Sequence, residues 1–182
     1  MINYFTTQNF FRFQAADGTM LIVGGLGLVT NRTKADADRI DALNALWVNG
    51  SWTGTPEELA EWVNDPIGAY NIADLNRVGE VIQYIADRLN GFGFVVSVSP
   101  KTDWAETDSP TAADMERYLK DVRTLRAAFA VLRTTPDAPS DMVRLTYTEA
   151  NNIEKILEDV DLLLTLTSQA WFYSGDLFSG EV

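Results

Sequence analysis

Acidic side chains are the residues of this chain whose type and number come nearest to supporting catalysis. Three acidic pairs stand out: Asp36 with Asp38, Asp103 with Glu106, and Glu154 with Glu158. Two carboxylates held about 5 to 10 Å apart can hydrolyse a glycosidic bond. Most of these carboxylates fall on expected solvent faces or at helix starts, where they interact with the helix dipole or keep the surface soluble. We therefore expect no enzyme activity and assign no catalytic residue.

Composition excludes several other kinds of catalytic and metal chemistry. The sequence has no histidine and no cysteine. Imidazole catalysis, thiol nucleophiles, disulfides and zinc held by histidine or thiolate are therefore excluded. The loop at residues 103–114 is acidic, but it lacks the carboxylate spacing and the glycine of an EF-hand, so we expect no metal there.

The glycine-rich stretch "GGLGLVT" at residues 24–30 resembles part of a dinucleotide-binding fingerprint. It has Gly25 and Gly27, but Thr30 stands at the third glycine position. The strand before it belongs to an expected hairpin and not to the strand–helix–strand unit that the fingerprint requires. We therefore expect a tight β connection here and no bound cofactor.

Five tryptophans are the remaining candidates for ligand contacts. Trp47, Trp62 and Trp171 have helical spacing and apolar neighbours, which favours packing in a core or an interface. Trp52 and Trp104 lie in expected loops, where an indole ring can stack on a sugar. These two residues are therefore possible ligand contacts.

The elements that position these residues begin with a nearly uncharged leader, residues 1–30. Asp17-Gly18 stands between "FFRF" and "TMLIV", which predicts a short β-hairpin. A lone two-stranded hairpin is marginal in water, so this one must dock on helices or pair with another chain. We expect residues 1–30 to be an attachment segment with these interface residues: Phe10, Phe11, Phe13, Met20 and Ile22.

Helix-capping pairs and helical apolar spacing organise residues 31–182. Five pairs mark helix starts: Thr33 with Asp36, Thr55 with Glu58, Asn71 with Asp74, Thr111 with Asp114, and Thr146 with Glu149. The first helix is expected to run to about Val48, with Ile40, Leu43 and Trp47 on one face. The predicted fold is mainly α, a compact bundle of four to five helices with a short N-terminal β-hairpin.

The C-terminal part of the last helix is apolar nearly all round. The stretch "LLLTLTSQAWFY" begins at Leu162, so that end should be buried within the domain or against a partner. An aromatic tail of this kind is expected to pack on another subunit. The expected interface residues are Trp171, Phe172, Tyr173 and Phe178.

Net charge limits the partners. The chain carries 14 basic and 26 acidic residues, a net charge of −12. This charge opposes binding to nucleic acids and to anionic membranes. We find no apolar run of the roughly 18 residues needed to span a bilayer, and the N-terminus lacks the basic region of a signal peptide. We therefore expect the chain to stay where it is made or to enter an assembly built there.

Three stretches carry a resemblance to known proteins. They are "GAYNIADLNRVGEVIQYIADRLNGFGFVVSVSPKTDW", "TAADMERYLKDVRTLRAAFAV" and "LTYTEANNIEKILEDVDLLL". Together, over residues 56–180, they resemble an uncharacterised family of tail- and tail-fibre-associated structural proteins from phages and prophages of gut Firmicutes. The hairpin sequence "ADG" at residues 16–18 is similar to tail-fibre connector segments. The resemblance implies a structural role in the virion and brings no catalytic residues.

The expected function is that of a bacteriophage virion structural protein in the tail or tail fibre, made in the bacterial cytoplasm. The expected partners are other copies of the chain and other virion proteins. The hairpin would offer its unpaired strand edges to a neighbouring chain. The alternative is a carbohydrate- or receptor-binding module. It would bind a host-surface glycan through Trp52, Trp104 and the C-terminal aromatics.

Overall fold

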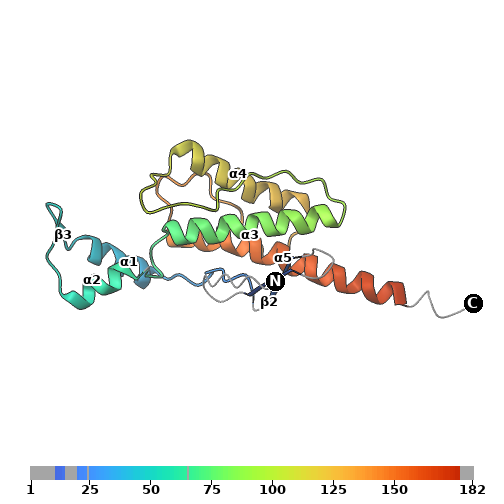
Figure 1. The fold of residues 1–182 in the computed structure, drawn as a ribbon, viewed down its shortest axis with the longest axis horizontal. Helices are drawn as coiled ribbons and strands as arrows, with labels where there is room; N and C mark the ends of the chain where they lie inside the picture. Colours follow the sequence, from blue (N-terminus) through green and yellow to red (C-terminus); the bar gives the residue numbers. More distant parts are fainter. Residues whose placement is uncertain (1–10, 15–19, 24, 65, 177–182) are drawn as a thin grey trace, which may run out of the picture.

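The computed structural model describes residues 11–14, 20–23, 25–64 and 66–176. Over these residues the chain is mainly helical, as expected, with five helices and two short antiparallel hairpins (Figure 1). The helices are α1 (Lys34–Asn44), α2 (Pro56–Val63), α3 (Ile72–Gly91), α4 (Ala112–Ala128) and α5 (Tyr147–Asp176). The strands are β1 (Phe11–Gln14), β2 (Met20–Val23), β3 (Trp47–Val48) and β4 (Ser51–Trp52).

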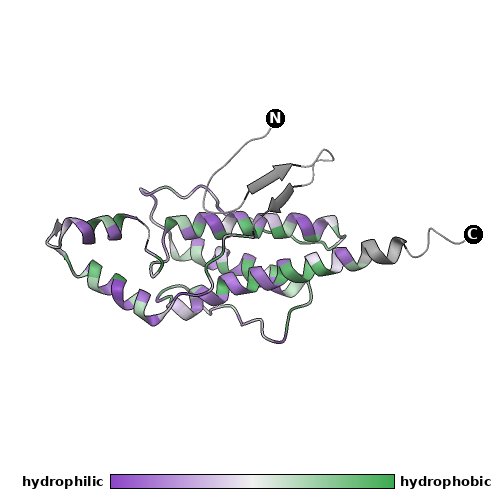
Figure 2. Ribbon diagram, turned by 90° about the horizontal axis from the view of Figure 1, so that it is seen from below, coloured by the Kyte–Doolittle hydropathy of each residue, from purple (hydrophilic) through white to green (hydrophobic). Residues whose placement is uncertain are grey.

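Helices α3, α4 and α5 pack side by side around the main core (Figure 1). Each helix contributes apolar side chains at three- and four-residue spacing, and polar residues fill its other faces (Figure 2). The fully buried apolar side chains of the core include Val78, Ile82, Ile85 and Leu89 of α3, Leu119, Val122 and Leu125 of α4, and Ile153, Ile156, Leu157, Val160 and Leu164 of α5. This core is the support on which the other elements of the fold are placed.

The capping pairs predict where the helices begin. Capping boxes open α1, α2, α3 and α4 at the four expected pairs. At the start of α5, Glu149 accepts hydrogen bonds from the backbone N–H and the hydroxyl of Thr146 at 2.9 and 2.8 Å. Side-chain oxygens thus satisfy backbone donors that have no partner within the helix.

The first helix ends earlier than the apolar spacing predicts. It ends at Asn44, and Trp47 lies in strand β3, so the expected helix to Val48 is wrong. Asn49 and Gly50 both adopt positive φ, 50° and 77°, which a tight two-residue hairpin turn requires. Trp47 therefore pairs across the hairpin with Trp52.

Residues 34–64, here called the arm, project from one end of the bundle (Figure 1). Helices α1 and α2 pack mainly on each other, joined by the β3–β4 hairpin. Leu43 is the buried residue of α1, and α2 has no buried residue in the structure as described. At the base of the arm, a Cβ at Gly68 would lie 2.1 Å from the backbone oxygen of Asp36. The returning chain therefore runs tightly against the start of α1.

A hairpin and a long helix lie toward the two ends of the chain. The expected N-terminal hairpin is present, since β1 and β2 pair antiparallel with Phe11 opposite Val23. Helix α5 has 30 residues against 20 in α3, about 45 and 30 Å at 1.5 Å per residue, so its C-terminal part runs beyond the bundle (Figure 2). On α5, Leu162 and Leu166 are 45% and 51% exposed. The chain itself does not fully cover this apolar stretch.

Candidate functional site

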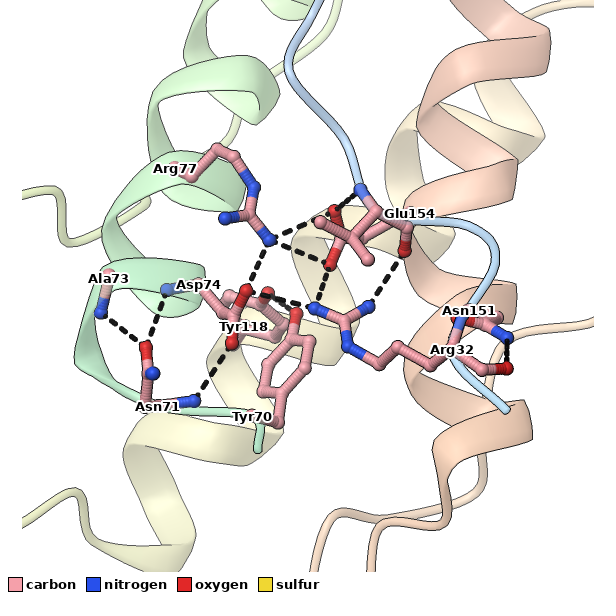
Figure 3. A network of polar contacts seen from close by, with 10 residues as sticks. Arg32, Tyr70, Asn71, Ala73, Asp74, Arg77, Tyr118, Asn151 and Glu154 are labelled. Atoms are coloured by element: carbon pink, nitrogen blue, oxygen red, sulfur yellow. Dashed lines mark hydrogen bonds and ion pairs between the residues drawn. The ribbon is translucent and has the colours of Figure 1, made fainter. Parts of the chain in front are cut away.

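Four charged side chains form a buried cluster where the leader meets the bundle (Figure 3). This ionic cluster consists of Arg32, Asp74, Arg77 and Glu154, whose side chains are 1%, 8%, 8% and 0% exposed. Arg32 Nη2 lies 2.9 Å from Asp74 Oδ1 and 2.8 Å from Glu154 Oε1. Arg77 Nη2 lies 3.1 Å from Glu154 Oε1 and also pairs with Asp74. Two positive and two negative groups therefore balance inside the fold.

Three separate segments supply the ionic cluster. Asp74 and Arg77 are three positions apart in the first turns of α3, so they share one helix face. Asp74 also closes the capping box of α3 by accepting from the backbone N–H of Asn71 at 3.0 Å. Glu154 comes from α5, and Arg32 comes from the segment that precedes α1. The cluster thus joins the segment between the leader and α1 to two bundle helices.

Side chains of α5 also form hydrogen bonds with the backbone of residues 29–32. Glu154 Oε2 accepts from the backbone N–H of Val29 at 2.6 Å. The amide of Asn151 accepts from the backbone N–H of Arg32 at 3.0 Å and donates to its carbonyl at 2.8 Å. Residues 29–32 are therefore fixed on α5.

Burial and pairing set the electrostatics of the ionic cluster. Burial raises the pKa of Glu154, and the neighbouring arginines oppose that shift. Burial also raises the pKa of Tyr70 and Tyr118, whose hydroxyls hydrogen-bond to each other. The Arg32 guanidinium carbon lies 5.2 Å from the centroid of the Tyr70 ring. Each charge is paired internally, so this arrangement suits a structural joint.

The arm carries a second feature, a cluster of three tryptophans. In this tryptophan cluster, the ring centroid of Trp47 lies 5.5 Å from that of Trp52 and 5.4 Å from that of Trp62. The interplanar angles are 69° and 61°, and Trp52 is tilted by 46° against Trp62. Edge-on contacts of this kind are favourable between aromatic rings. They hold the small hairpin against α2.

The tryptophan cluster remains partly open to solvent. Trp47 is 40% exposed, Trp62 is 37% exposed, and beside them Val48 and Val63 are 48% and 61% exposed. Trp62 Nε1 donates to Asn44 Oδ1 at 2.9 Å, which fixes its ring on α1. The result is an ordered apolar surface on an element outside the main core.

The structure places the two possible ligand contacts differently. Trp52 lies in β4 within the tryptophan cluster and is partly exposed. Trp104 lies in a loop, as expected, but it is 8% exposed and packs against the bundle core, so its contact with a ligand stays a prediction. The Asn76 amide holds its backbone, accepting from the Trp104 N–H at 2.7 Å and donating to its carbonyl at 2.9 Å.

The expected interface residues fall at the two extended ends. Phe10 and Phe178 lie outside the described residues. Strands β1 and β2 contain Phe11, Phe13, Met20 and Ile22, and α5 contains Trp171, Phe172 and Tyr173, each described by its backbone alone. Their assignment to an interface stays a prediction.

Sequence reasoning missed the ionic cluster. Glu154 belongs to an acidic pair of the kind assigned to solvent, yet it is fully buried. Its position, four residues after Ala150 and three before Leu157, lies on the apolar face of α5, and this spacing is the signal that could have found it. Of the other acidic groups, Asp36 works in a helix cap and Asp103 pairs with Lys101 at the surface.

Comparison with known proteins identifies no relative of this chain. No family model, no curated protein and no solved structure matches the chain. Within the described residues, no group of three or more acidic, histidine or cysteine side chains is arranged to hold a metal ion. No helix in the same part of the chain is long and apolar enough to cross a bilayer.

Proposed function

We propose that this chain is a structural protein of a bacteriophage virion, located in the tail or tail-fibre region. It acts by binding copies of itself and other virion proteins. The resemblance of residues 56–180 to tail-associated proteins supports the location. The observation that carries the mode of action is the exposed tryptophan cluster on the arm, Trp47, Trp52 and Trp62.

The tryptophan cluster has the properties of an interface centre. Tryptophan is enriched among the residues that carry most of the energy of protein–protein contacts. Burying apolar surface is worth roughly 25 cal/mol per Å², and a large aromatic side chain offers about 150 to 250 Å². Because the rings already support one another, little side-chain entropy is lost when a partner covers them.

The ionic cluster supports the same role for the leader. Together with Asn151, it holds residues 29–32, which follow the β1–β2 hairpin in the chain, on α5. A two-stranded hairpin has unpaired backbone groups on its outer edges, and a strand of a neighbouring chain can pair with them. The leader is thus the proposed attachment element, with the bundle as its support.

The alternative proposal is a glycan-binding module, and ring geometry makes it the weaker one. The exposed rings of Trp47 and Trp62 meet at 61°, so they do not form one flat surface on which successive sugar rings could stack. A glycan array with wild type and Trp52→Ala separates the proposals. Specific glycan binding that the variant loses would favour the alternative.

The direct test of the virion role is to locate the chain in purified phage particles from its producing host. Mass spectrometry of particles separated into heads and tails should find the chain at fixed stoichiometry in the tail fraction. A chain that is abundant in the lysate and absent from intact particles would contradict the proposal.

A further inference from the structure

A groove on the outer side of α4 has a charge opposite to that of the arm. The groove encloses about 800 Å³ between α4 and the extended segment at residues 97–99. Its lining includes the apolar side chains of Val98, Ala113 and Ala127. It can therefore accept an apolar group from a partner.

Basic side chains border this groove. Arg117 is 47% exposed and pairs with Asp114 at 2.6 Å, whereas Lys120 is exposed and forms no ion pair with any described residue. The Arg123 guanidinium bonds to the carbonyls of Pro139 and Ser140, so no carboxylate neutralises its charge. The groove is lined by three basic side chains, Arg117, Lys120 and Arg123, and by two acidic ones, Glu116 and the buried Asp121, a net charge of +1 within a chain of −12.

The arm has the complementary character. Residues 34–64 contain two basic and six acidic residues, a net charge of −4. Glu57 and Asp41 are exposed, and the tryptophan cluster with Val63 supplies the apolar centre. The arm thus carries exposed apolar side chains and a net negative charge, and the groove on α4 has apolar lining residues and a net positive charge.

We propose that the arm of one copy binds the α4 groove of the next copy. In Figure 1 the arm points away from the α4 of its own chain, and tight packing at Gly68 fixes its base. The contact is therefore between different surfaces of two molecules, which generates a ring if the rotation closes and a filament if it does not. This inference rests on the proposed structural role and names the partner of the arm.

The first test measures the mass of the full chain by light scattering over a range of concentrations. The wild type should form species larger than dimers, with the fraction assembled rising with concentration and falling with added salt. Val63→Arg on the arm and Lys120→Glu in the groove should each lower the assembled fraction at least tenfold. Val63 is 61% exposed, so circular dichroism should show an intact fold. Arg133→Glu changes an exposed charge outside the groove and is the matched control.

Mixing the two defective variants tests the contact itself. One intact arm and one intact groove remain in each mixed pair, so a mixture of Val63→Arg and Lys120→Glu should form a one-to-one heterodimer and nothing larger. A monomeric wild type, assembly that persists in both variants, or a mixture without heterodimer would overturn the inference. If the chain is nevertheless found in particles, the proposed virion role stands and the arm binds a different partner. Conversely, if the two variants form the heterodimer but the chain is absent from phage particles, only the proposed function is contradicted.

Discussion

Glu154 of α5 accepts a hydrogen bond at 2.6 Å from the backbone N–H of Val29, a residue 125 positions earlier in the chain. The same carboxylate pairs with Arg32 and Arg77 at 2.8 and 3.1 Å. One buried side chain therefore joins the leader, α3 and α5. The path of residues 29–32 along α5 depends on this joint.

Replacing Glu154 should strongly destabilise the fold. Glu154→Gln leaves two buried arginines facing one carboxylate, and breaking a buried ion pair typically costs about 3–5 kcal/mol. Urea denaturation measures this change in the free energy of unfolding. The control is Glu158→Gln, an exposed residue of the same helix that pairs with Lys155, with an expected cost below about 1 kcal/mol. Equal losses in the two variants would contradict the assigned joint.

The helix cap at Asp114 should make part of the stability depend on pH. Hydrogen bonds from the hydroxyl and the backbone N–H of Thr111 lower the pKa of Asp114 from its ordinary value of 3.8. The folded state therefore favours the ionised form, and its contribution is present above pH 3.8 and is lost as pH falls through the lower folded pKa. The stability difference between wild type and Asp114→Asn should shrink along this acid limb. A difference that stays constant from pH 6 to pH 2 would refute the cap's electrostatic role.

Gly68 should be intolerant of a side chain. A Cβ there would lie 2.1 Å from the backbone oxygen of Asp36 and 2.9 Å from Ile40 Cγ1, so Gly68→Ala should cost about 1–3 kcal/mol and loosen α1. Gly91→Ala is the control, because nothing lies within 4 Å of its Cβ position and the residue is helical. The control should be neutral or stabilise by about 0.5–1 kcal/mol. Thermal unfolding of both variants tests whether the backbone at Gly68 packs as tightly against the start of α1 as described.

The arm should open independently of the bundle. Trp62→Ala removes two ring contacts and the hydrogen bond to Asn44, but it removes nothing from the main core. Hydrogen exchange followed by mass spectrometry should speed up in residues 34–64 and stay unchanged in α3 and α5. Faster exchange throughout α3 would instead show that the arm and the bundle form one cooperative unit.

Local signals predicted the helices, and long-range packing decided the rest. A capping box involves residues three positions apart, so the sequence alone locates helix starts such as Thr111. Helical spacing wrongly extended α1 to about Val48, because the turn at Asn49 and Gly50 outweighs it. The burial of Glu154 could be anticipated from its helix face, but its partner Arg32 carries no local signal. Their contact exists because two segments more than a hundred residues apart pack together.

The central claim is that the tryptophan cluster becomes covered when the chain enters its particle. Hydroxyl-radical footprinting of Trp47 and Trp62, 40% and 37% exposed in the isolated chain, tests it directly. Both rings should be oxidised readily in the purified protein and strongly protected in intact particles, while exposed Val143 should react equally in both. Equal oxidation of the two tryptophans in the free and the particle-bound chain would contradict the account.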